Sequence, residues 1–194
     1  MKEASPVVRF ATKNRGKYDE AARVAANYGI ELVQLKVEKY EIQAEDLAKI
    51  ATVAAERAFK ESKMSGVVAE DAGFFVDALN GFPGPYSSYV YRKLGLEGVL
   101  RLLGNTAERA AHFSSAVAYC SGRETACFEG VVKGTVGFTP IGSYGFGFDP
   151  IFIPNDGGGR TFAEMDIDEK NRHSHRGLAF SRFCQWLKFQ SPQK

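Results

Sequence analysis

The sequence predicts a mixed α/β fold, and two observations carry this prediction. The first 35 residues hold two apolar, β-prone runs, Val7–Ala11 and Glu31–Leu35, separated by a turn and a segment with helical spacing. This order is that of a βαβ unit with parallel strands. Later, the segments His112–Tyr119 and Thr125–Val136 are joined through Ser121-Gly122-Arg123, which favours an antiparallel hairpin. Parallel and antiparallel strands in one chain indicate a mixed architecture.

The other elements of the first half follow from spacing and from turn residues. Alanine and valine recur at helical spacing over Lys17–Tyr28, and Gly29 ends that helix. A second helix is expected from about Asp46 to Ser62, because its apolar residues form one stripe. The run Gly66–Ala69 predicts a third strand, which leads into Glu70-Asp71.

The second half begins with a segment rich in proline and glycine. Asn80–Pro85 holds two prolines and two glycines and is expected to be a rigid loop. Two short helices should follow, around Tyr86–Lys93 and Glu97–Leu103, and a strand is expected over Asp149–Pro154. An amphipathic helix over Ser174–Gln190 closes the chain. Its predicted apolar anchors are Leu178, Phe180, Phe183 and Leu187.

Composition limits the class of protein. With 194 residues, the chain is expected to form one domain over residues 1–194. Lys plus Arg is 25 and Asp plus Glu is 23, a net charge of +2, which argues against a nucleic-acid partner. No run of 18 apolar residues predicts a membrane span. Three cysteines without a C-x-x-C pair favour a reducing, cytoplasmic setting, with a Cys120–Cys127 crosslink as the alternative.

The loop after the first strand, Thr12–Lys17, is a candidate site for polyphosphate. It combines backbone N–H groups, a helix N-terminus and three basic side chains, which together suit a phosphate anion. It does not match the G-x-x-x-x-G-K-[ST] loop of the P-loop proteins. The alternative is an ordinary turn capped by Asn14, with solvated basic residues.

Carboxylates form the second candidate site. Glu70 and Asp71 follow an apolar strand, and the carboxyl ends of strands are where α/β sheets bind ligands. Adjacent carboxylates call for a neutralising cation, and Mg²⁺ prefers oxygen ligands. Glu41, in the segment Lys39–Gln43, is a further carboxylate. The alternative is a helix cap or an exposed turn.

Two later segments complete the candidates. In Ser143–Pro150, glycines allow close approach of a ligand to the backbone, and phenylalanines offer faces for stacking a base. The alternative is that these phenylalanines are core residues at the start of a strand. In Lys170–Arg176, basic residues crowd the expected start of the last helix, where the helix dipole disfavours cations. Either solvent exposure or a bound anion must compensate the unfavourable placement of these cations, and we expect an anionic ligand.

The order of the motifs is more specific than any one of them. The series is Thr12-x-Asn14-x-x-Lys17, Glu70-Asp71-x-Gly73, Gly81-Phe82-Pro83-Gly84-Pro85-Tyr86, Phe146-Gly147-Phe148-Asp149-Pro150-x-Phe152, Thr161-Phe162-Ala163-Glu164-Met165 and Lys170-x4-His175-Arg176. This series resembles the inosine triphosphate pyrophosphatase family from Val7 to Leu187. That family cleaves deaminated purine nucleoside triphosphates, (d)ITP and XTP, to the monophosphate and pyrophosphate.

The resemblance implies a fold, a cofactor and an assembly. It implies a long twisted sheet with helices forming two lobes around a central cleft, bound Mg²⁺ and a homodimer. The carried-over site is Thr12, Asn14 and Lys17 for the triphosphate, Glu41 and Asp71 for Mg²⁺, Asp71 as the base with Glu70 assisting, Phe146, Gly147, Phe148 and Asp149 around the purine, and Lys170, His175 and Arg176 completing its pocket. Three positions depart from the family pattern: Lys13 for a frequent Gly, Phe148 for a frequent Trp or Tyr, and Ser88 for a lysine found in some members.

Selectivity for the base would follow from hydrogen-bond donors. Lys170, His175 and Arg176 are mainly donors, and hypoxanthine and xanthine present a carbonyl at position 6 where adenine presents an amino group. A donor aimed at position 6 pairs with the carbonyl and leaves the amino group unpaired, which costs about 1–3 kcal/mol. We therefore expect ITP to be favoured over ATP, with Phe146 or Phe148 stacking either purine.

Three rival functions remain. A Maf-type pyrophosphatase has the same fold, but its N-terminal loop is rich in Ser and Arg, unlike Thr12-Lys13-Asn14-Arg15. A nucleotide-binding module without turnover would not need Glu41, Glu70, Asp71 and Lys17 together. A nucleic-acid-binding protein is disfavoured by the near-neutral charge.

Overall fold

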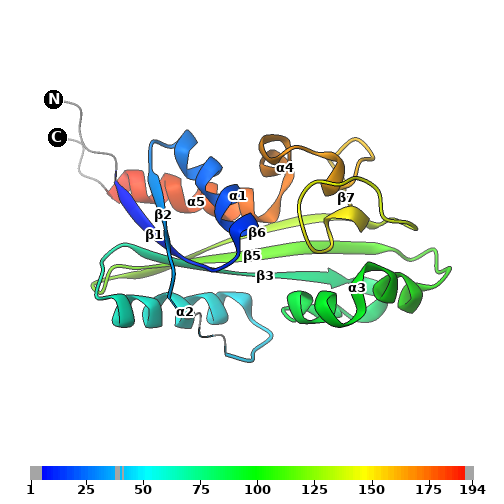
Figure 1. Cartoon of the computed structure of the whole chain (residues 1–194), viewed down its shortest axis with the longest axis horizontal. Coiled ribbons are helices and arrows are strands. Elements are labelled where there is room, and N and C mark those ends of the chain that lie inside the picture. Colours follow the sequence, from blue (N-terminus) through cyan, green and yellow to red (C-terminus); the bar gives the residue numbers. More distant parts are fainter. Residues whose placement is uncertain (1–5, 38–39, 41, 191–194) are drawn as a thin grey trace.

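The computed structural model describes residues 6–37, 40 and 42–190, which fold around one mixed sheet (Figure 1). Its strands are β1 (Val7–Ala11), β2 (Glu31–Leu35), β3 (Val67–Val76), β4 (Pro83–Gly84), β5 (Ala110–Cys120), β6 (Thr125–Val136) and β7 (Phe152–Pro154). Its helices are α1 (Arg15–Asn27), α2 (Leu47–Ser62), α3 (Ser87–Leu103), α4 (Ile167–His173) and α5 (His175–Gln190). Short 3-10 turns cover Asp77–Leu79, Asp149–Ile151 and Phe162–Glu164.

The sheet has the order β2-β1-β3-β5-β6-β7, with β4 beside β3. β1 pairs in parallel with β2 and β3, whereas β3, β5, β6 and β7 pair antiparallel. The predicted βαβ unit and the predicted hairpin are therefore both present. The mixed α/β class is confirmed.

The sheet opens along one side of β3. β1 pairs with β3 only at Arg9↔Val67 and Phe10↔Val68, and β4 pairs with it at Phe74↔Gly84 and Phe75↔Pro83. Between these pairs, no strand of the described ranges covers residues 69–73 on that side. The strand order also reverses at β1, since α1 leads to β2 and α2 leads to β3 on the opposite side. Ligands of open α/β sheets bind at such a switch point.

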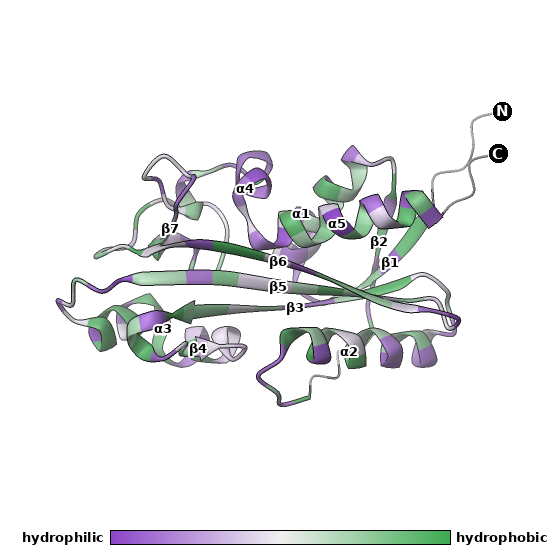
Figure 2. Ribbon diagram, turned by 180° about the vertical axis from the view of Figure 1, so that it is seen from behind, coloured by the Kyte–Doolittle hydropathy of each residue, from purple (hydrophilic) through white to green (hydrophobic). Residues whose placement is uncertain are grey.

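Helices cover both faces of the sheet. α1, α4 and α5 lie on one face, and α2 and α3 lie on the other (Figure 1). Phe10, Phe180 and Phe183 belong to the apolar core beneath α1 and α5, whereas Ala51 and Ala55 pack α2 closely against the other face. A third, aromatic core fills the far end of the sheet near α3 and β7. The hydrophilic residues of α2 lie mostly on its outer side (Figure 2).

Local capping explains where two predicted helices begin and end. Asp46 Oδ1 accepts hydrogen bonds from the N–H groups of Ala48 and Lys49, at 2.8 and 3.2 Å, and starts α2. Gly29, with φ +71°, follows the end of α1. The two short helices expected after the proline-rich loop form α3, which is interrupted at Gly95, where φ is 65°.

Three expectations about elements were wrong, and one helix was not predicted. β3 continues to Val76, so Glu70 and Asp71 lie within the strand and not at its end. Asp149–Ile151 is a 3-10 turn and only Phe152–Pro154 is a strand, because Pro150 has no N–H for a sheet. Leu178 is exposed and is not part of the apolar core beneath α1 and α5, and helix α4 was not predicted.

Candidate active site

A cleft of about 570 Å³ opens at the gap between β1 and β4. The β1–α1 loop, the middle of β3, the start of α3, the segment before β7 and the α4–α5 junction form its walls. The predicted residues that line it are Thr12, Asn14, Lys17, Asp71, Phe146, Gly147, Phe148, Asp149, Lys170, His175 and Arg176. The structure thus gathers segments that lie far apart in the sequence. Glu41 lies outside the described residues.

The β1–α1 loop is organised by its own side chains. The N–H of Asn14 donates to Thr12 Oγ1 at 3.1 Å, and the N–H of Lys17 donates to Asn14 Oδ1 at 3.1 Å. Asn14 is therefore the N-cap of α1, as the alternative interpretation had it, but the loop lines the cleft and is not an ordinary surface turn. The positive end of the α1 dipole is directed at the cleft, which favours an anion there.

The side chains of Glu70 and Asp71 lie on opposite faces of the sheet. Successive strand residues point to opposite sides, and Val68 packs in the core of α1 and α5 whereas Ala69 packs in that of α2. Glu70 accordingly lies on the α1 and α5 side. Asp71 lies on the other side and lines the cleft, with 7% of its surface exposed.

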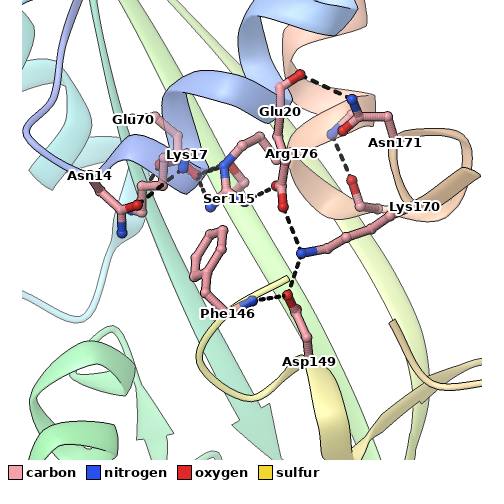
Figure 3. A network of polar contacts seen from close by, with 12 residues as sticks. Asn14, Lys17, Glu20, Glu70, Ser115, Phe146, Asp149, Lys170, Asn171 and Arg176 are labelled. Atoms are coloured by element: carbon pink, nitrogen blue, oxygen red, sulfur yellow. Dashed lines mark hydrogen bonds and ion pairs between the residues drawn. The ribbon is translucent and has the colours of Figure 1, made fainter. Parts of the chain in front are cut away.

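Glu70 is a buried, ion-paired carboxylate. Its Oε1 accepts from Ser115 Oγ at 2.8 Å and from Arg176 Nε at 3.1 Å, and its Oε2 lies 2.8 Å from Lys17 Nζ. Figure 3 shows these groups converging beside Asn14. This carboxylate holds two cations in place and does not line the cleft.

A second ion cluster joins four segments of the chain (Figure 3). Lys170 Nζ lies 2.7 Å from Glu20 Oε1 and 2.5 Å from Asp149 Oδ2, and Arg176 Nη1 lies 2.5 Å from Glu20 Oε2. All four residues are at most 3% exposed. Together with Glu70 and Lys17 they form a network of three carboxylates and three cations.

This network corrects our expectation for Lys170–Arg176. We expected an anionic ligand to compensate the cations, but the anions are the protein's own Glu20, Glu70 and Asp149. The sequence also misplaces Lys170, which lies on α4 and not at the start of the last helix. Ser174 does begin α5, because its Oγ accepts from the N–H of Gly177 at 3.0 Å.

The network shifts the pKa values of its members. Burial raises the pKa of Glu20, but the charges of Arg176 and Lys170 more than offset this, so its pKa is lowered overall. Burial lowers the pKa of Lys170, and Asp149 and Glu20 reverse that shift, so its pKa is raised. The pKa of Arg176 is raised by Glu70 and Glu20 against the effect of burial. Glu20 is therefore held as an anion and both bases as cations.

His175 is the neutral member of the buried set. Its ring stacks on Phe113 with centroids 4.6 Å apart, and it is 2% exposed. Burial lowers its pKa well below the ordinary value, and the charge of Arg176 lowers it further. His175 is thus a neutral imidazole at the cleft at pH 7.

We expect His175 to make the protein less stable below pH 6.5. The unfolded chain protonates its imidazole near pH 6.5 and the folded chain does not, so stability is present above that pH and is lost as the pH falls. The loss approaches about 1.4 kcal/mol per pH unit. Urea unfolding measures the free energy of unfolding at pH 7.5 and at pH 5.5. The decrease between these two pH values should be smaller for His175→Gln than for the wild type. His112, whose pKa is also lowered, is common to both proteins, and equal losses would contradict the prediction.

The two phenylalanines have different environments. Phe146 lies over the ion network, with its ring centroid 4.9 Å from Lys170 Nζ and 5.5 Å from Arg176 Cζ. Phe148 is 3% exposed and stacks on Phe74 at 5.0 Å within the aromatic core. The structure therefore favours Phe146 for stacking a base, and Phe148 supports the wall behind it.

Three residues of the site escaped the sequence reasoning. Glu20 lies one turn after Lys17 on α1, and Ser115 lies on β5 next to Glu70; neither belongs to a motif. Arg92 reaches the cleft from α3, where its Nη1 donates to Ser88 Oγ at 2.7 Å. A cation is therefore present beside the position where some members carry lysine. The one sequence signal for Glu20 is its spacing of three residues from Lys17, which places both side chains on the same side of a helix.

The donor set suits a cation that is shared with a substrate. No group of three His, Cys, Asp or Glu able to hold a metal ion occurs within residues 6–37, 40 and 42–190. Asp71 brings one carboxylate to the cleft. Mg²⁺ is usually bound by one or two carboxylates together with substrate phosphates and water, so the residues present fit that ion and do not form a complete protein cage.

The fold and the cleft define an α/β protein with an anion-binding helix terminus, a carboxylate and an aromatic face around one cavity, a combination suited to a nucleotide. The chain belongs to the Ham1 family, whose model matches residues 8–186. It is 48% identical over 180 residues to the dITP/XTP pyrophosphatase of Thermococcus kodakarensis, covering 92% of this chain and 96% of the relative. It is 46% identical over 182 residues to the dITP/XTP pyrophosphatase of Methanopyrus kandleri, covering 93% and 96%.

Solved structures agree with this placement. The Ham1 protein of Staphylococcus aureus is 27% identical with a TM-score of 0.81, over 95% of this chain and all of that one. The nucleoside-triphosphatase and dITP/XTP pyrophosphatase of Mycobacterium abscessus is 33% identical with a TM-score of 0.70, over 93% and 99%. The resemblance read from the motif series is confirmed.

None of the helices in the described part of the chain is long and apolar enough to cross a membrane.

Proposed function

We propose that this chain hydrolyses deaminated purine nucleoside triphosphates, (d)ITP and XTP, to the monophosphate and pyrophosphate. The observation that carries the proposal is one cleft lined by the capped β1–α1 loop, Asp71 and Phe146. These supply an anion site, a carboxylate and a stacking face in a volume of about 570 Å³. The named activity of the relatives agrees with this chemistry.

The triphosphate is held by the β1–α1 loop. Thr12 and Asn14 contribute polar groups beside the helix N-terminus, and Lys17 contributes a cation. Lys17 is 2.8 Å from Glu70 in this structure, so a phosphate oxygen competes with that carboxylate for the same ammonium. A cation fixed at the site of bond cleavage stabilises charge that develops on the phosphates.

Asp71, together with Glu41, is proposed to hold Mg²⁺. When bound, the ion offsets phosphate charge and lowers the pKa of a coordinated water. Asp71 orients the attacking water toward the linkage between the α- and β-phosphates, because cleavage of that linkage gives the proposed products, the monophosphate and pyrophosphate. Glu70 assists from the other face of β3 by fixing Lys17 and Arg176.

The purine is proposed to be recognised where Phe146 and the α4–α5 junction line the cleft, close to the β1–α1 loop. Phe146 offers its ring to the base, Gly147 and Asp149 form the adjoining wall, and Phe148 backs it. Arg176 is oriented by Glu20 and Glu70, and it retains N–H groups beyond these contacts, since a guanidinium carries five. Donors from Lys170, His175 and Arg176 at position 6 favour a carbonyl over an amino group.

The assembly and the setting are further parts of the proposal. A homodimer is supported by exposed aromatic residues on and before α3, among them Phe82, Tyr86 and Tyr89, and light scattering at micromolar concentration tests it. One domain in two lobes is supported by the single sheet that runs through all three cores. A reducing cytoplasm is supported by Cys120, Cys127 and Cys184, all of which are free.

The proposed reaction is tested with a panel of ITP, dITP, XTP, GTP and ATP, with products separated by chromatography. We expect monophosphate and pyrophosphate from the first three substrates, and loss of turnover when EDTA removes Mg²⁺. Diphosphate with orthophosphate would contradict the cleavage position. Tight binding without turnover would favour a nucleotide-binding module, and a preference for other bases would favour a Maf-type enzyme.

A further inference from the structure

Gly16 lies on the first turn of α1 in contact with the ring of Phe146. A Cβ placed on Gly16 would lie 2.6 Å from Phe146 Cδ1 and 2.7 Å from Phe146 Cε1, closer than carbon atoms pack. The backbone at Gly16 is helical and does not require glycine. Because glycine is a poor helix former, the space taken by the ring is the physical reason for a glycine here.

The ring of Phe146 is bounded on a second side, and its backbone is anchored. Its backbone N–H donates to Asp149 Oδ2 at 2.7 Å, and the same oxygen accepts from Lys170 Nζ at 2.5 Å. Lys170 and Arg176 of the ion network lie over the Phe146 ring. Figure 3 shows the ring rising from this anchored backbone toward the network. A group added at Gly16 must therefore turn the ring about its side-chain bonds, because the backbone is held.

We propose that Gly16 is a positioning residue for purine binding: its missing side chain gives the Phe146 ring a place against α1 and leaves the cleft open for the base. The inference rests on the proposed function, since it assigns the base to Phe146. It places a determinant of base binding in the loop that is otherwise assigned to the phosphates.

The test compares Gly16→Ala with the wild-type chain. The control is Gly137→Ala, since a Cβ at Gly137 meets its neighbours only at 3.5–3.7 Å and that residue lies away from the cleft. Binding of IMP and of inorganic tripolyphosphate is measured by calorimetry with Mg²⁺, and KM and kcat are measured with ITP. We expect Gly16→Ala to weaken IMP binding and raise KM by about 10-fold or more, with a smaller change in kcat. Tripolyphosphate, which has no base, should bind as it does to the wild type.

Thermal unfolding separates this role from damage to the fold. Alanine is the better helix former, so the midpoint for Gly16→Ala should equal or exceed that of the wild type. A second arm places Gly16→Ala in a Phe146→Ala background, where we expect no further loss of IMP affinity because the ring is gone.

Three outcomes would overturn the inference: unchanged IMP affinity and KM in Gly16→Ala, an equal loss for tripolyphosphate and IMP, or an undiminished loss in the Phe146→Ala background. Failure of the proposed function looks different, because the wild-type chain itself would then neither bind IMP nor release pyrophosphate from ITP.

Discussion

Asp71→Asn is expected to lower kcat for ITP at least ~100-fold, the scale of losing a major electrostatic element of an active site. The substitution keeps the shape of the side chain and removes its charge. Asp71 is the carboxylate of β3 that lines the cleft, whereas Glu70, its neighbour, is turned to the other face. The loss should therefore fall on turnover and on the affinity for Mg²⁺, while the ion network behind β3 stays intact.

The matched control is Asp77→Asn, the same isosteric change in the exposed turn that follows β3. Initial rates with ITP over a Mg²⁺ titration, together with thermal unfolding, measure both effects. Near-normal turnover in Asp71→Asn would remove this residue from the mechanism. A large drop in the unfolding midpoint would assign it a structural role instead.

Lys170→Met is expected to destabilise the fold by about 3–5 kcal/mol, the cost of breaking a buried ion pair by removing one partner. Lys170 lies between Glu20 and Asp149, at 2.7 and 2.5 Å. Methionine fills a similar volume and leaves two carboxylates without that cation. The pKa of Asp149, which burial already raises, should rise further, because Lys170 lowers it in the native protein.

Urea unfolding at pH 7.5 measures this loss, with Lys60→Met on the exposed side of α2 as the control. Adding Asp149→Asn to Lys170→Met should recover part of the stability, since one unpaired charge is removed. A loss no larger than that of the control, or a double variant less stable than Lys170→Met, would show that the network does not stabilise the fold.

Local patterns were sufficient for much of the fold. Residue types at periods of 2 and 3.6 predicted β1, α1, β2, α2 and the β5–β6 hairpin, because each of these elements buries one regular face. Capping by Asp46 and termination by Gly29 follow from neighbours in the chain. The order of the motifs determined the family, since it depends on residue identity and not on packing.

Only the tertiary structure decided the partners of the charged residues. Lys170 and Glu20 are 150 positions apart and meet because α4 packs beside α1, so no local rule could pair them. Strand length decided the roles of Glu70 and Asp71: a strand that continues to Val76 sends them to opposite faces. The tertiary structure also separated Phe146 from Phe148, two phenylalanines of the same motif. Phe146 lies over the ion network, whereas Phe148 lies in the aromatic core. Periodicity predicts which face of an element is buried, whereas contacts between distant elements decide what each buried or cleft-facing side chain meets.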